Sequence, residues 1–113
     1  MSVKTTLNYS PNFDKKKRGQ NKIKFIILHY TGMKTESAAL RRLTDPKSKV
    51  SAHYCIKKNG EIITLVPDLY IAWHAGKSYW KKYTNLNKNS LGIEITNPGH
   101  NIKYEKFSKA QIE

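Results

Sequence analysis

The stretch that decides the fold is I-K-F-I-I-L-H-Y, residues 23–30, which ends at the turn signal Thr31-Gly32. A nearly continuous apolar run of this length, rich in Ile and Phe, predicts a strand buried on both faces. His29 stands at the end of this run, where a ring can point into the crevice in which α/β proteins bind ligands. The alternative for a lone histidine is a hydrogen-bonded core residue, and the pattern leaves both interpretations open.

Two further elements follow this strand in the sequence. Thr35 or Ser37 can cap a short helix that Asp45-Pro46 would end. Asn59-Gly60 then separates two apolar segments, residues 52–57 and 61–66, and this dipeptide is the strongest short signal for a hairpin. We therefore expect a helix and then two antiparallel strands.

The segment L-G-I-E-I-T, residues 91–96, alternates and predicts another strand, and residues 108–112 resemble the first turn of a helix. Strand, helix, hairpin, loop and strand together predict an α/β fold, with a mixed central β-sheet flanked by helices. Within residues 91–96, Glu94 must face the side opposite Ile93 and Ile95. If that side is a cleft, burial will shift the pKa of Glu94. The alternative is a solvent-facing residue on an edge strand.

With 113 residues the chain can form one small core. We expect residues 1–20 to be an extended or irregular N-terminal arm and residues 21–113 to be the functional domain. The first twenty residues lack the apolar centre of a signal peptide, and no apolar run approaches the roughly 18 residues of a membrane span.

The formal net charge is +13, which would attract a polyanion such as nucleic acid or an acidic cell-wall polymer. The lysines are scattered, which is typical of a solvated surface, and no helix-turn-helix or zinc-finger spacing is present, so we expect no specific nucleic-acid partner. The single cysteine, Cys55, rules out an internal disulfide. Its apolar surroundings predict a small buried hydrophobe, and a catalytic thiol is the alternative.

Five strings in order carry a family resemblance: LHYTGM (28–33), VSAHYCIKKNGEI (50–62), LVPD (65–68), AWHAGKSYW (72–80) and NSLGIEITNPGH (89–100). Together they resemble the N-acetylmuramoyl-L-alanine amidases, a family that includes T7 lysozyme, AmiD-type envelope amidases and the peptidoglycan recognition proteins. The resemblance runs from about Tyr9 to Gln111 and is nearest to the AmiD type.

The resemblance implies a zinc ion held by two histidines and an Asp or Cys. The family's first ligand falls on His29, and the remaining ligands are expected beyond Glu113. His100 is not the missing histidine in this pattern. His53 and His74 show no local metal-binding spacing. Unless a second chain or fragment supplies the rest, for example by self-association, we expect this polypeptide to be catalytically incomplete.

The resemblance also implies roles at the catalytic centre. The family's catalytic glutamate falls on Glu94, which would act as the general base. Trp73 and His74 match a stretch that lines the substrate groove, with the Trp73 ring facing sugar or peptide. Asn89 is expected at the substrate site too and, with Ser90, would position the strand that carries Glu94.

The function implied is hydrolysis of the amide bond between N-acetylmuramic acid, or its anhydro form, and the L-alanine of a peptidoglycan stem peptide. The partner would be peptidoglycan or a muropeptide, in the cytoplasm or periplasm of a bacterium. The alternative is a non-catalytic peptidoglycan-recognition module. The presence of both His29 and Glu94 argues against it, because a pure binder needs no general base.

Overall fold

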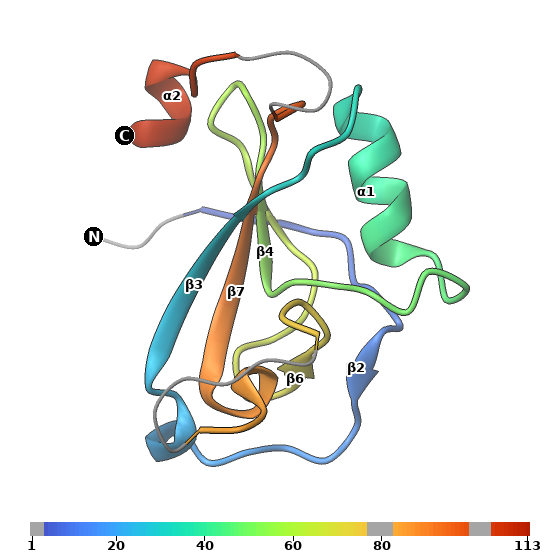
Figure 1. Cartoon of the computed structure of the whole chain (residues 1–113), viewed down its shortest axis with the longest axis vertical. Helices are drawn as coiled ribbons and strands as arrows, with labels where there is room; N and C mark the ends of the chain where they lie inside the picture. Colours follow the sequence, from blue (N-terminus) through green and yellow to red (C-terminus); the bar gives the residue numbers. More distant parts are fainter. Residues whose placement is uncertain (1–3, 77–82, 100–104) are drawn as a thin grey trace.

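The computed structural model describes residues 4–76, 83–99 and 105–113. Two sheets form: one of five strands in the order β1-β5-β4-β7-β3, and one of two strands, β2 and β6 (Figure 1). The strands are β1 (Thr6–Leu7), β2 (Phe13–Asp14), β3 (Phe25–Tyr30), β4 (Tyr54–Ile56), β5 (Ile62–Thr64), β6 (Ile71–Ala72) and β7 (Ser90–Ile95). The helices are α1 (Glu36–Thr44) and α2 (Lys109–Ile112), with 3-10 turns η1 (Gln20–Lys22) and η2 (Leu86–Asn89).

The large sheet is mixed, which confirms the α/β class predicted from the element order. β7 pairs in parallel with β3 on one side and with β4 on the other, while β4 and β5 form the antiparallel hairpin. In the described parts of the chain, neither helix is long and apolar enough to cross a membrane.

Local sequence signals account for the ends of most elements. The Thr35 side chain caps α1 by accepting a hydrogen bond from the Ala38 amide at 3.1 Å, and Asp45 ends the helix. Gly60 has φ of +88° in the hairpin turn, a left-handed conformation that favours glycine. Ser108 begins α2 with a reciprocal capping box. These three predictions are confirmed.

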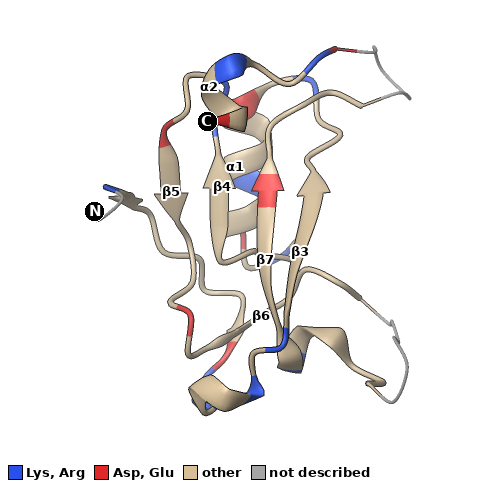
Figure 2. Ribbon diagram, turned by 90° about the vertical axis from the view of Figure 1, so that its left-hand side faces the viewer, with Lys and Arg blue, Asp and Glu red and all other residues tan. Residues whose placement is uncertain are grey.

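The prediction that residues 23–30 are buried on both faces is wrong. β3 is one of the two edge strands of the sheet, and its side chains alternate between half-buried and exposed. Ile26 is 64% exposed and Leu28 is 63% exposed. The reason is that α1 lies behind the sheet, whereas none of the described helices covers the face that Figure 2 turns toward the viewer.

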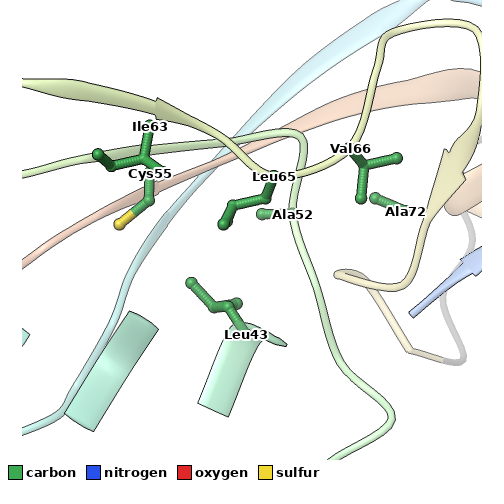
Figure 3. Close-up of a cluster of buried hydrophobic side chains, with 7 residues drawn as sticks. All are labelled: Leu43, Ala52, Cys55, Ile63, Leu65, Val66 and Ala72. Carbon is green, nitrogen blue, oxygen red and sulfur yellow. The ribbon is translucent and has the colours of Figure 1, made fainter. Parts of the chain in front are cut away.

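The core lies between α1 and the sheet. Its buried side chains, drawn in Figure 3, are Leu43, Ala52, Cys55, Ile63, Leu65, Val66 and Ala72. Cys55 is fully buried on β4, and burial raises the pKa of its thiol to about 12. A thiol held protonated in this way is a poor nucleophile, so Cys55 is the buried hydrophobe that its apolar surroundings predict.

The N-terminal arm is extended, as expected, but it is joined to the fold. β1 pairs with β5, and β2 pairs with β6. Arg18 is buried and donates hydrogen bonds to the carbonyl oxygens of Asp68, in the loop after β5, and Asn87, in η2, and these bonds fasten the arm to both segments. The division into residues 1–20 and 21–113 stays a prediction.

Leu43→Ala tests the packing of α1 on the sheet. Leu43 is 5% exposed, so truncation leaves a cavity against Cys55 and Leu65 and should lower the free energy of unfolding by about 2–5 kcal/mol. Urea denaturation measures the change. The exposed neighbour Arg41→Ala serves as the control and should stay within about 0.5 kcal/mol of the parent. Equal stability of both variants would show that α1 does not depend on this contact.

Candidate functional site

A pocket of about 220 Å³ opens between α1, the ends of β3 and β7, and the loop after β6. The parallel register pairs His29 of β3 with Glu94 of β7, so the two side chains leave the sheet on the same face, and both line the pocket. The pocket is completed by Tyr30, Thr31, Met33, Ala39, Arg42, Leu43, Val50, Ser51, Trp73 and His74.

Glu94 lies in this pocket and not on a solvent-facing edge, because β7 is an inner strand flanked by β3 and β4. Its Oε2 is buried, and no group in the described residues forms a hydrogen bond with it. Burial raises the pKa of Glu94 from 4.5 to about 7, and the positive charge of Arg42 lowers it only in part. A buried carboxylate without a partner is costly, and such groups gather at functional sites.

His29 contacts another histidine that is far away in the sequence. Its Nε2 lies 3.1 Å from Nδ1 of His74, and the two rings meet edge to face with centroids 5.2 Å apart. Burial lowers the pKa of His29 below its ordinary value. His29 is therefore a neutral imidazole at the pocket wall, the form in which histidine binds metals.

His74 is held on several sides. Its Nε2 lies 3.0 Å from the Ser90 hydroxyl, and its backbone amide donates to the Asn87 side chain. A side chain at position 92 would collide with the His74 ring, so Gly92 makes the room that the ring occupies. Burial, followed by the nearby charges of His29, His53 and Arg18, lowers the pKa of His74 to about 3.

Trp73 and Asn89, both expected at the substrate site, differ in position. Trp73 lines the pocket, and its indole Nε1 donates to the Asp14 carboxylate at 2.8 Å. Asn89 does not line it; its amide donates to the Lys22 carbonyl at 3.0 Å, at the opposite end of β7 from Glu94. This bond ties the residue before β7 to η1, and both roles expected for Asn89 stay predictions. His100 and residues 77–80 of the AWHAGKSYW string lie outside the described residues.

His53 is fully buried beside His74, with ring centroids 6.1 Å apart. Its Nδ1 accepts a hydrogen bond from the Gly92 amide, and its Nε2 lies 2.8 Å from the Tyr70 carbonyl oxygen. Both ring nitrogens are thus occupied by backbone groups. His53 is the hydrogen-bonded core histidine in this fold, whereas His29 faces the pocket.

Among the charged residues that line the pocket, Arg42 is the one that the sequence did not single out. It lies three residues after Ala39 on α1, on the helix face that meets the pocket. The i, i+3 spacing from a buried alanine was the signal that could have identified it.

The donor chemistry at this pocket suits zinc, but the described donors are too few. Imidazole nitrogen and carboxylate oxygen are both zinc ligands, and a catalytic zinc takes three protein ligands and one open position. Among residues 4–76, 83–99 and 105–113, no three His, Cys, Asp or Glu side chains lie close enough to hold a metal together. His29 can thus supply one ligand of such a site.

The sequence is similar to those of known amidases. The family model described as N-acetylmuramoyl-L-alanine amidase matches residues 19–113. The amidase AmiD of Escherichia coli is 40% identical over 104 residues, covering 81% of this chain and 37% of AmiD. The 1,6-anhydro-N-acetylmuramyl-L-alanine amidase AmpD of Haemophilus influenzae is 31% identical over 103 residues, covering 76% of this chain and 55% of AmpD.

A solved structure shares the fold. E. coli AmiD, in complex with the substrate anhydro-N-acetylmuramic acid-L-Ala-D-gamma-Glu-L-Lys, superposes with a TM-score of 0.68 at 37% identity, covering 88% of this chain and 43% of that one. The chain spans between about a third and just over half of the length of the two curated relatives. Since the family model matches most of the sequence, the chain belongs to the N-acetylmuramoyl-L-alanine amidase family.

Proposed function

We propose that this chain carries the general base and one zinc ligand of an enzyme that hydrolyses the amide bond between N-acetylmuramic acid, or its anhydro form, and the L-alanine of the stem peptide. The observation that carries the proposal is the buried Oε2 of Glu94, which has no partner among the described residues and shares a pocket with His29. The amidase names of the relatives support the reaction type.

Each residue has a distinct part in this proposal. The chemistry supplied by zinc, when bound, is polarisation of the scissile carbonyl and a lower pKa for the attacking water. His29 would supply one nitrogen ligand. Glu94 would take the proton of the attacking water and pass it to the leaving amine, a task that suits a carboxyl group whose pKa is about 7. Trp73 would offer its ring face to sugar or peptide.

A muropeptide is the substrate class that the relatives favour. The AmiD structure holds an anhydro-muramoyl tripeptide, and the AmpD relative is named for the anhydro sugar. A recognition module without catalysis is the second candidate. It needs no general base, and the carboxyl group of Glu94 placed beside His29 favours the enzyme.

Glu94→Gln in a complete enzyme that contains this segment separates the enzyme from the recognition module. The amide keeps the shape of the carboxyl group but cannot accept the proton, so the turnover of muramoyl-L-alanine bonds should fall roughly a hundredfold or more. Muropeptide affinity and zinc content should hardly change, because the carboxylate acts on charge that develops in the transition state. Turnover at the parental rate would remove Glu94 from the mechanism. Equal binding without cleavage by either form would favour the recognition module.

The pKa of Glu94 predicts a pH-dependent stability for the metal-free chain. The folded state holds the Glu94 proton more tightly than the unfolded state, so its contribution to stability is complete below pH 4.5 and is lost as the pH rises through about 7. Glu94→Gln abolishes this loss. The variant should therefore gain stability relative to the parent between pH 4 and 8, by an amount on the order of 3 kcal/mol, in urea unfolding. Parallel pH profiles would contradict the raised pKa.

The zinc content of this polypeptide, purified alone, should be well below one ion per chain, because the described residues supply no group of three ligands. Elemental analysis after dialysis against a chelator measures it. One tightly held zinc per chain would contradict this expectation. A molar mass of twice that of the monomer in the same sample would then assign the missing ligands to a second copy.

A further inference from the structure

A chain of hydrogen bonds leads from the pocket wall into the protein. It joins four segments: His29 on β3, His74 in the loop after β6, Ser90 on β7, and the Leu86 carbonyl in η2. Ser90 is fully buried, and none of the catalytic roles proposed above uses it. We call these four residues the histidine relay.

Donor and acceptor in each hydrogen bond of the relay can be assigned by starting from the Leu86 carbonyl. The Leu86 carbonyl can only accept, and it lies 2.7 Å from the Ser90 oxygen, so the Ser90 hydroxyl donates to it. The Ser90 oxygen is then left as an acceptor for His74, whose Nε2 lies 3.0 Å away and must carry the hydrogen.

The same argument extends to His29. A neutral His74 with hydrogen on Nε2 has a bare Nδ1, and this nitrogen can only accept. His29 Nε2, at 3.1 Å, must therefore donate to it. The Nδ1 of neutral His29 is left with a free lone pair, and no described residue donates a hydrogen bond to it.

Hydrogen bonds and close packing hold His74 in place in the relay. The Asn87 side chain accepts hydrogen bonds from the backbone amides of His74 and Ala75, at 3.2 and 2.8 Å. The His74 ring lies over Gly92, where an added Cβ would come within 2.4 Å of it. The ring is therefore packed closely against the Gly92 backbone, and the loop that carries it is anchored by Asn87.

We propose that His74 and Ser90 are positioning residues. They fix the tautomer of His29 so that its Nδ1 is the nitrogen that binds the metal. This inference rests on the proposed function, in which His29 binds the metal, and it refines the predicted role of His74 from a substrate contact to one exerted through His29. Groups that orient a metal-binding histidine in this way typically change metal affinity by about 10–100-fold.

The test reads the imidazole tautomers directly, in the ¹⁵N-labelled chain without metal or substrate, by NMR spectra of the long-range couplings between ring protons and ring nitrogens. In the parent, His29 and His74 should both carry hydrogen on Nε2. Ser90→Ala removes the acceptor of His74, so His74 should move to the Nδ1-protonated form and donate to His29. The Nδ1-protonated form of His29 should then become the major one. Ser10→Ala, another buried serine that lies outside the relay, should leave both rings as in the parent.

A second pair of variants covers the case in which Ser90→Ala does not fold. His74→Phe keeps a ring over Gly92 without an acceptor, so the Nε2 hydrogen of His29 should exchange with water faster and its tautomers should mix. His74→Gln offers an amide oxygen in place of Nδ1 and should restore the parental state. Zn²⁺ titrated into the chain should then shift the His29 signals at about tenfold higher concentration in His74→Phe than in the parent or His74→Gln.

Two results would overturn the proposal. One is a parental His29 with hydrogen on Nδ1. The other is a His29 tautomer that stays unchanged in folded Ser90→Ala and in His74→Phe. Because these readouts need no turnover, they are independent of the Glu94→Gln experiment, and an inactive complete enzyme would leave the relay intact.

Discussion

The parallel pairing of β3 with β7 is the constraint on which the site depends. Six residue pairs in register, from Phe25 with Ser90 to Tyr30 with Ile95, place His29 directly beside Glu94 on one face of the sheet. Side chains alternate between the faces of a strand, so a slip of one residue would place Ile93 or Ile95 beside His29 and turn Glu94 to the uncovered face. The same pairing sets Ser90 and Gly92 below the His74 ring.

Much of the fold could be predicted because its signals are local. The Thr35 cap, the Asn59-Gly60 turn and the alternation in residues 91–96 each act within a few residues, and each element formed where expected. The burial of residues 23–30 could not be predicted in the same way. An apolar run records that a strand is apolar on both faces, but not whether a second layer covers both. That depends on β3 being an edge strand with α1 on one side only.

The residues of the site differ in the same way: local patterns predict some of them, and contacts between distant segments determine the others. The alternation of Glu94 with two isoleucines showed which way its side chain turns, and the structure adds that this side is a pocket. The contact between His29 and His74 spans 45 residues and depends on a loop, so no spacing rule could reveal it. Asn89 shows that closeness in the sequence can also mislead. It stands next to the strand that bears Glu94, yet five residues of extended chain, about 16 Å, separate the two positions along β7.

The charges around the pocket do not provide a partner for the buried Oε2 of Glu94. The chain carries a net charge of +13, but that excess is mainly lysine and none of it pairs with Glu94 in the described structure. The nearest histidines are neutral, because burial disfavours their cationic forms. Arg42 lowers the pKa of Glu94 without cancelling the effect of burial. A carboxyl group and a bare imidazole nitrogen thus share a pocket in which Arg42 offsets only part of the cost of burying the carboxyl group. In the proposed enzyme, a bound zinc ion would compensate both groups at once.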